Sequence, residues 1–358
     1  MKSKVKYLSI SIIVPVYNEE VNLKRLLPSL AKQTYPKEKM EYIVIDDSST
    51  DNSSQLAKDF GAKVIKVKNH DIERNKGVGL YAAKNNLIYW LDADMELCSN
   101  TYLERMAKPF QENKNLIGAF TNEFALDCSP YVKNSFLRFI SYDPFQCDPT
   151  YKFFSPSLKD TFVEKRGDYY ICKFVSGKIP PAGRSMYRRR ELLKTEVGNN
   201  RSFIDMDALE IVTQAGLNLF AYVPKAKMRH YHCDSLIHLI RKKPFRNTGT
   251  KSLADQSYLG DQSGAYLPNF EKRKYLWFNH RKPEGALKIL FWVIYANLFF
   301  PELIRGIYKS IKYKDFAFLW QPLTTISITD AMIYGFLARS EGRKLTFRVF
   351  KSLLGISK

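Results

Sequence analysis

The first 120 residues alternate between patterns of buried strands and patterns of short helices. Residues 9–16 (SISIIVPV) form a continuous apolar run rich in β-branched residues, which is typical of a strand buried on both faces of a parallel sheet. Leucines at helical spacing follow between residues 21 and 30. The other expected elements are strands at 41–46, 62–67, 87–91 and 116–121 and helices from 49 or 51 to 60 and over 76–86. Strands that alternate with helices predict an α/β fold with a mostly parallel sheet flanked by helices.

Polar clusters follow three of these strands where each strand ends. They read PVYNEE at 15–20, DDSSTD at 46–51 and DAD at 92–94. Ligands bind at the carboxyl ends of strands in an open parallel sheet, so the three clusters predict one site. Neighbouring carboxylates repel one another unless they share a cation, and their oxygens suit Mg²⁺ or Mn²⁺ beside a diphosphate. Tyr17 can stack on a base, and Asp47 can accept a hydrogen bond from the base or the ribose.

These clusters carry a resemblance to a known family. In this order and spacing, IIVPVYNEE, IDDSSTDNS and LDADMEL resemble the family 2 glycosyltransferases, which have the Rossmann-like GT-A fold. The resemblance continues at residues 183–192, 202–216 and 223–232. It implies inverting transfer of a sugar from a nucleoside diphosphate sugar, with a divalent metal, Mn²⁺ or Mg²⁺, as cofactor.

The resemblance also implies roles for individual residues. Tyr17 would flank the base, Asp47 would contact it, and Asp92 would contact the ribose or the sugar. Asp94 would ligate the metal, with Asp92 and His230 as further candidate ligands, and Asp205 would be the catalytic base that activates the acceptor. The remaining residues of the implied nucleotide site are Pro15, Glu19, Asp46, Arg74, Lys76 and Ala93.

This chain departs from the family pattern at two places. Ile204 precedes Asp205 where the family usually has a glutamate, so one carboxylate of that pair is missing. The family often has Arg-Asn before a glycine, and the best-aligned positions here are 76–79 (KGVG). Structural roles stay open for some residues, because Asp205 can be a first-turn residue favoured by the helix dipole and His230 can be a core histidine. His232 lies two residues beyond His230 and points the same way in an extended chain.

Positive charge is concentrated in the last third of the chain. The protein has 56 Lys and Arg against 36 Asp and Glu, a net charge of +20, and residues 241–358 hold 21 basic and 8 acidic groups, or +13. Two apolar stretches, 286–300 and 316–338, lie within this basic third. Apolar and aromatic stretches flanked by Lys and Arg predict contact with a membrane surface, as interfacial helices or a shallow re-entrant pair. Glu302 and Asp330 are expected to disfavour deep burial in lipid.

Three segments with different tasks are expected along the chain. Residues 1–122 form the nucleotide-sugar-binding half of a GT-A domain, residues 123–240 its acceptor-binding half, and residues 241–358 the membrane-associating helices. The odd count of five cysteines, without CxxC spacing, fits a reducing compartment, and no signal-peptide pattern opens the sequence. We expect a peripheral, monotopic or re-entrant protein at the cytoplasmic face of the cell membrane, acting on a lipid-linked or cell-envelope glycan.

Two other functions compete with this interpretation. A nucleotidyltransferase acting on sugar phosphates would also use an α/β sheet with acidic metal ligands. Such enzymes usually carry a glycine-rich phosphate loop near the N-terminus, and PVYNEE is not one. A basic nucleic-acid-binding protein would account for the charge, but no recognised nucleic-acid module is present and the charge lies beside apolar stretches. Nucleic acid is therefore not an expected partner.

Overall fold

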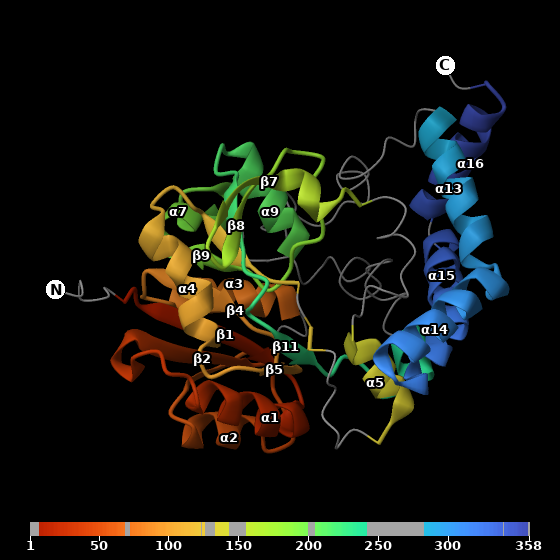
Figure 1. Cartoon of the computed structure of the whole chain (residues 1–358). Helices are drawn as coiled ribbons and strands as arrows, with labels where there is room; N and C mark the ends of the chain where they lie inside the picture. Colours follow the sequence, from red (N-terminus) through yellow and green to blue (C-terminus); the bar gives the residue numbers. More distant parts are fainter. Residues whose placement is uncertain are drawn as a thin grey trace. The chain divides into compact units, whose positions relative to one another are not determined.

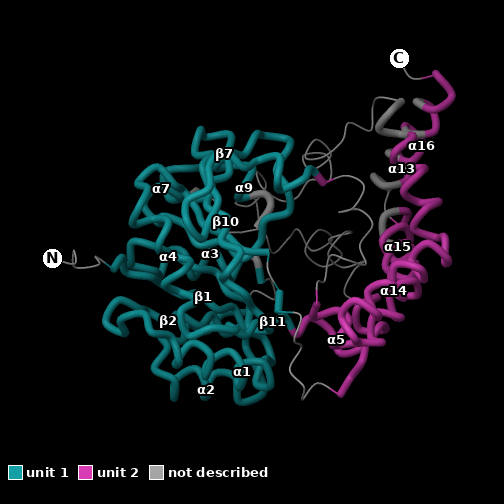
Figure 2. Tube along the Cα trace, in the orientation of Figure 1, with its two compact units in different colours: residues 1–125, 156–230, 261–267 teal, residues 126–155, 231–260, 268–358 magenta. Residues whose placement is uncertain are grey.

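The computed structural model describes most of the chain and divides it into two units (Figures 1 and 2). The described ranges are 7–68, 72–122, 124–125, 133–142, 155–199, 205–241, 283–338 and 340–356. The first unit holds residues 1–125, 156–230 and 261–267, and the second holds residues 126–155, 231–260 and 268–358. The expected division into segments 1–122, 123–240 and 241–358 stays a prediction, and the second unit combines residues 126–155 with two later segments.

The first unit is built on a nine-stranded sheet with the strand order β3-β2-β1-β4-β9-β6-β10-β8-β7. Its strands are β1 (Ile10–Val16), β2 (Met40–Asp46), β3 (Lys63–Lys66), β4 (Leu87–Trp90), β6 (Gly118–Phe120), β7 (Phe162–Arg166), β8 (Tyr169–Lys173), β9 (Met186–Arg188) and β10 (Leu219–Tyr222). Its helices are α1 (Glu20–Ala31), α2 (Ser53–Asp59), α3 (Ile72–Ala82), α4 (Tyr102–Glu112), α7 (Arg189–Leu193), α8 (Glu196–Asn199) and α9 (Asp205–Gln214). Short 3-10 helices cover Lys37–Lys39 and Leu158–Thr161.

Both faces of this sheet are covered by helices. Strand β1 is buried along its whole length, as its continuous apolar run predicts. Ile12 and its neighbours on one face pack against leucines of α1 and against α2 and α4. Ile13, on the opposite face, belongs to a second core with residues of α3 and α9. The sheet is therefore the central layer of an α/β sandwich, and the ends of its strands remain available for a site.

The prediction of a mostly parallel sheet is correct for β1 to β4 and needs correction beyond them. The pairs β1–β2, β1–β4, β2–β3 and β6–β10 are parallel, whereas β4–β9, β6–β9, β8–β10 and β7–β8 are antiparallel. The sheet is therefore mixed, because β9 and β8 run against their neighbours. A separate two-stranded ribbon joins β5 (Met95–Leu97) to β11 (Met228–His230).

Helix α3 begins and ends four residues before the expected positions. After Ala82 the chain leaves the helix because two asparagines bond the start of β1. The Asn85 amide donates to the Ile10 carbonyl at 3.0 Å, and the Ser9 hydroxyl donates to Asn86 Oδ1 at 2.8 Å. Gly79 lets α3 approach the sheet, since a Cβ there would lie 2.1 Å from Cγ2 of Ile13. The close approach explains a glycine in the middle of a helix.

The second unit is helical in its described parts. It contains α5 (Ser135–Tyr142), α13 (Pro283–Ala296), α14 (Phe299–Tyr313), the 3-10 helix η4 (Phe316–Trp320), α15 (Gln321–Leu337) and α16 (Ser340–Leu353). Its core joins Phe139 of α5 to Phe318 of η4 and Ile328 of α15. The Arg138 guanidinium donates two hydrogen bonds of 3.1 Å to the Asp315 carboxylate, which ties α5 to the turn before η4.

Within the described ranges, every helix taken alone falls short of the length and apolar character needed to span a bilayer. The segments Leu290–Ala296 and Phe299–Tyr313, which meet at 61°, satisfy the requirement together by length and composition.

Candidate active site

The loops that follow β1 and β2 hold each other through hydrogen bonds. The Asn18 backbone N–H donates to Ser49 Oγ at 3.0 Å, and the Thr50 N–H donates back to Asn18 Oδ1 at 2.8 Å. The Glu19 N–H donates to Ser53 Oγ at 2.8 Å. Asn18 has a φ of 54°, a left-handed conformation that asparagine tolerates better than most residues. The two polar clusters predicted at strand ends therefore form one preorganised rim.

Two aspartates at the end of β2 are buried beneath this rim. Asp46 is the last residue of β2, and its Oδ1 accepts a hydrogen bond from the Ser49 N–H at 3.0 Å. Asp47 follows it, and its Oδ2 accepts a hydrogen bond from the Asn75 amide at 2.9 Å. Tyr17, at the end of β1, is 55% exposed. The loops thus present an exposed aromatic ring and a fixed carboxylate, which can stack on a base and accept a hydrogen bond.

The end of β4 is joined to α3 by an ion pair. The Lys76 Nζ lies 3.5 Å from Asp92 Oδ1, and the Lys76 side chain is almost fully buried. Trp90, the last residue of β4, donates its indole N–H to the Lys76 carbonyl at 3.0 Å. Arg74 lies two residues earlier in α3 and is half-buried. Burial of an ammonium is costly without a partner, so Asp92 stabilises Lys76 at this position.

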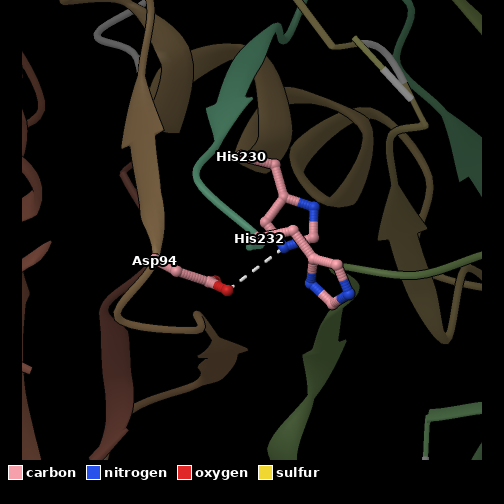
Figure 3. Close-up of side chains that lie close together, drawn as sticks. All are labelled: Asp94, His230 and His232. Atoms are coloured by element: carbon pink, nitrogen blue, oxygen red, sulfur yellow. Dashed lines mark hydrogen bonds and ion pairs between the residues drawn. The ribbon is translucent and has the colours of Figure 1, made fainter. Parts of the chain in front are cut away.

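A carboxylate and two imidazoles meet beside β5 and β11 (Figure 3). Pairing of these strands places His230 opposite Met95, so His230 Nε2 lies 3.2 Å from Asp94 Oδ2. One ligand atom from each of Asp94, His230 and His232 lies within 4.8 Å of the other two. Asp92, also a predicted ligand, is not part of this group and faces Lys76 instead. The adjacent residue in the DAD cluster, Ala93, is buried.

Burial and charge keep His230 in its neutral form. Burial lowers the pKa of His230, the Arg184 guanidinium lowers it further, and Asp94 opposes this effect without cancelling it. Arg184 Nη2 lies 3.4 Å from His230 Nδ1, and its guanidinium stacks 4.4 Å from the centre of the Phe124 ring. A neutral imidazole has a lone pair to offer a metal. One carboxylate and two imidazoles form a donor set that fits Mn²⁺, because imidazole nitrogen suits transition metals better than Mg²⁺.

The predicted catalytic base lies at the start of α9. Asp205 is the first residue of this helix, and its side chain, like that of Asp207, lies outside the described part of the structure. Further along α9, Glu210 accepts hydrogen bonds from the Gly177 N–H at 3.1 and 3.2 Å. The helix is thereby fixed to the loop that follows β8. The backbone places Asp205 in the sheet-covering helix, and its role stays a prediction.

Two residues of the site were not selected from the sequence. Asn75 holds Asp47, and Arg184 lies against His230. A signal for Asn75 was present, because Arg74 and Asn75 form an Arg-Asn pair two residues before Gly77. Arg184 lies in the stretch 183–192 that resembles the family, but nothing there pointed to His230, which is 46 residues away in the sequence.

The other residues of the predicted nucleotide site lie at or next to the strand ends that the sequence predicted. Pro15 is buried in β1, and Glu19 precedes α1 with its Oε2 accepting a hydrogen bond from the Asn22 amide at 2.6 Å. The ends of β1, β2 and β4 are adjacent because these strands are neighbours in the sheet. An aromatic ring of a kind that stacks on bases and a carboxylate–imidazole group of a kind that holds metals therefore follow neighbouring strands.

Comparison with known proteins finds a family model that matches part of this chain. Residues 11–170 match the family model described as glycosyl transferase family 2. The poly(ribitol-phosphate) beta-N-acetylglucosaminyltransferase TarS of Staphylococcus aureus is 37% identical over 91 residues, which are 24% of this chain and 16% of that protein. The uncharacterized glycosyltransferase EpsJ of Bacillus subtilis is 24% identical over 288 residues, covering 78% of this chain and 72% of that protein.

Similarity to the first curated relatives is confined to a part of their length. Matches to the Staphylococcus and Haloferax relatives span 16% to 33% of those proteins. Among solved structures, the mannosyltransferase PcManGT from Pyrobaculum calidifontis, in complex with GDP-Man and Mn²⁺, aligns with a TM-score of 0.49 at 14% identity. That alignment covers 92% of this chain and 88% of the other.

Proposed function

Because residues 11–170 match the family model of glycosyl transferase family 2, we propose that this protein transfers a sugar from a nucleoside diphosphate sugar to an acceptor hydroxyl, with inversion at the anomeric carbon. The observation that carries this proposal is the convergence of three strand ends on one rim. The loops after β1 and β2 are joined by hydrogen bonds, and the end of β4 supplies Asp92 and Asp94.

The donor nucleotide would lie along this rim. Tyr17 stacks on the base, and Asp47, held by Asn75, accepts a hydrogen bond from the base or the ribose. Lys76 and Arg74 lie in α3 near the end of β4, where their positive charge favours the diphosphate. Asp92, half-exposed and paired with Lys76, is available to the ribose or the sugar.

Asp94, His230 and His232 would hold the divalent metal. The two imidazoles favour Mn²⁺ over Mg²⁺ at this position. When bound, such a metal neutralises negative charge on a departing nucleoside diphosphate. The neutral form of His230, favoured by its burial and by Arg184, keeps its nitrogen lone pair available.

Asp205 would act as the catalytic base. Its carboxylate takes the proton from the acceptor hydroxyl, whose oxygen forms a bond to the anomeric carbon while the bond to the diphosphate oxygen breaks. A single displacement of this kind inverts the anomeric centre and needs no enzyme nucleophile. The position of Asp205 at the first turn of α9, in the segment that resembles the family, supports this role.

The acceptor we propose is a lipid-linked or cell-envelope glycan at the cytoplasmic face of the cell membrane. The basic and apolar last third of the chain supports a peripheral, monotopic or re-entrant attachment there. The name of the Staphylococcus aureus relative, a poly(ribitol-phosphate) glycosyltransferase, points to the same class of acceptor.

Donor binding provides the test. Thermal stabilisation and slow hydrolysis would be measured for a panel of nucleoside diphosphate sugars, beginning with UDP-N-acetylglucosamine and GDP-mannose, with Mn²⁺, Mg²⁺ or EDTA. We expect one donor to stabilise the protein in the presence of Mn²⁺ and to lose this effect in EDTA. Absence of any donor effect in a folded protein would contradict the proposal, as would transfer of a nucleotidyl group instead of a sugar.

A further inference from the structure

Helix α14 of the second unit has its polar side chains inside and its apolar side chains outside. Glu302, Gly306 and Ser310 form the buried face of this helix. On the opposite side, Phe300 and Ile311 are each 73% exposed. A helix of a water-soluble domain buries its apolar stripe, so the amphipathic order of α14 is reversed.

The carboxylate on the buried face is hydrogen-bonded inside the second unit. Glu302 accepts hydrogen bonds from the Tyr295 hydroxyl and from the Gln321 amide, each at 2.8 Å. Gly306 allows the close approach of η4, because a Cβ there would lie 2.7 Å from the Phe318 carbonyl oxygen. Helix α15 also turns polar residues inward, with Gln321, Thr324, Thr325 and Thr329 all buried. Small residues and small polar side chains at helix contacts are typical of helices that pack against each other in lipid.

The exposed stripe of α14 is continuous. Phe300, Ile304, Ile307 and Ile311 follow each other at intervals of three or four residues, and each is exposed. Helix α13, which precedes α14, also exposes apolar side chains, namely Leu290, Phe291 and Ile294. The outward face of α15 is mixed, since Asp330 lies between Leu323 and Tyr334. The apolar surface therefore belongs to α13 and α14, and a soluble monomer rarely exposes one of this kind.

The charges around this surface indicate what covers it. Residues 283–356 contain ten Lys and Arg against five Asp and Glu. Of the five acids, Asp315 is bonded to Arg138 of α5, and Glu302 is buried and paired with Arg305, which leaves nine basic against three acidic groups. Lys309, Lys312 and Lys314 cluster at the C-terminal end of α14. An apolar stripe next to lysines matches the acyl chains and the anionic headgroups of a bilayer.

We propose that the outer apolar residues of α13 and α14 are inserted among the acyl chains of an anionic membrane, with the lysines at the end of α14 at the headgroups. From the sequence alone, Glu302 was expected to disfavour deep burial in lipid. In the structure its side chain faces the interior of the second unit and is hydrogen-bonded there. The inference deepens the proposed function by naming the membrane-binding surface, and it stands on contacts within the second unit.

Vesicle flotation tests the proposal on the full-length chain. Wild-type protein is expected to float with phosphatidylcholine vesicles that contain phosphatidylglycerol, and less with vesicles of phosphatidylcholine alone. The double variant Ile304→Glu, Ile311→Glu is expected to reduce the floated fraction by about tenfold or more. Each substitution removes the favourable free energy of transferring an isoleucine side chain from water into the acyl chains. Val163→Glu is the matched control, since Val163 is an apolar residue of β7 that is 58% exposed in the first unit.

Three outcomes would overturn the proposal. One is a wild-type protein that does not float, as expected if residues 242–282 cover the stripe. Another is a double variant that floats as well as the wild type. The third is a wild-type dimer in light scattering that becomes a monomer in the double variant while neither protein floats, which would identify a second copy as the partner. Thermal unfolding verifies that the variants fold, and flotation needs no sugar transfer, so its failure is distinct from failure of the proposed reaction.

Discussion

The side-chain amide of Asn75 donates a hydrogen bond of 2.9 Å to Oδ2 of Asp47, and both side chains are buried. Asn75 lies in α3, whereas Asp47 lies at the end of β2, 28 residues earlier. This bond fixes the carboxylate that we expect to meet the donor base or ribose. Through Asp47, Asn75 can therefore set the geometry of the proposed nucleotide pocket.

Asn75→Ala is expected to weaken donor-nucleotide binding by about tenfold. The reason is that leaving a buried carboxylate without its hydrogen bond costs roughly 1–3 kcal/mol of free energy. Isothermal titration calorimetry with the nucleoside diphosphate and Mn²⁺ measures the change. Asn85→Ala is the matched control, since Asn85 bonds the Ile10 carbonyl at the other end of β1. Equal affinities for the Asn75 variant and the wild type would remove Asn75 from the pocket.

Asp94→Ala is expected to abolish metal-dependent nucleotide binding and to leave the fold intact. Asp94 is the carboxylate of the Asp94, His230 and His232 group, so its removal leaves only two imidazoles for a divalent cation. Electron paramagnetic resonance of Mn²⁺ measures binding without any need for turnover. Asp168→Ala provides the control, because Asp168 is exposed and pairs with Lys225. Unchanged Mn²⁺ binding by the folded Asp94 variant would rule out this metal site.

Asp205→Asn is expected to bind the donor normally and to lose sugar transfer by roughly a hundredfold or more, the range for a positioned general base. The asparagine keeps the shape of the side chain but cannot take the proton. Steady-state transfer and donor affinity are measured in parallel. Asp207→Asn is the comparison within the same helical turn, and a larger loss in that variant would move the role of base to Asp207.

Protonation of Asp315 is expected to destabilise the second unit in acid. Burial raises the pKa of Asp315, but hydrogen bonds from Arg138, the Ala317 N–H and Tyr142 outweigh it and hold this pKa below its usual value. A carboxyl group whose pKa is lower in the folded than in the unfolded protein stabilises the fold. This stabilisation is fully present at pH values above the pKa of the unfolded state, which is about 4. This stability is lost as the pH falls through the folded value.

Thermal unfolding measured between about pH 6 and about pH 3 tests this expectation. Asp315→Asn should lower the unfolding free energy by about 1–3 kcal/mol at pH 6, and its difference from the wild type should shrink toward pH 3. Asp330→Asn, which alters an exposed carboxylate of the same unit, should show little change. A difference for Asp315→Asn that stays constant with pH would show that the ion pair does not carry this stability.

Local sequence determined the first half of the sheet and most of the nucleotide rim. The continuous run of β1 and the alternation of periods predicted β1 to β4, because buried parallel strands need apolar residues on both faces. The positions of the polar residues at the strand ends then follow directly, because they come last in a strand or next after it in the sequence: Tyr17, Asp46, Asp47 and Asp92. The reversed strand β9 was not predicted, since its three residues become a strand only by pairing with β4 and β6.

Tertiary structure decided which distant residues meet and which helix faces turn inward. His230 lies 136 residues from Asp94, and only the register of β11 on β5 brings them to 3.2 Å. The sequence of α14 shows that it has an apolar side and a polar side, yet it does not say which side is buried. Gly306 and Glu302 decide this, because a helix without a Cβ at that position can approach Phe318, and Gln321 and Tyr295 then satisfy the carboxylate. Long-range pairing and close approach depend on residues far apart in the chain, and no local pattern encodes them.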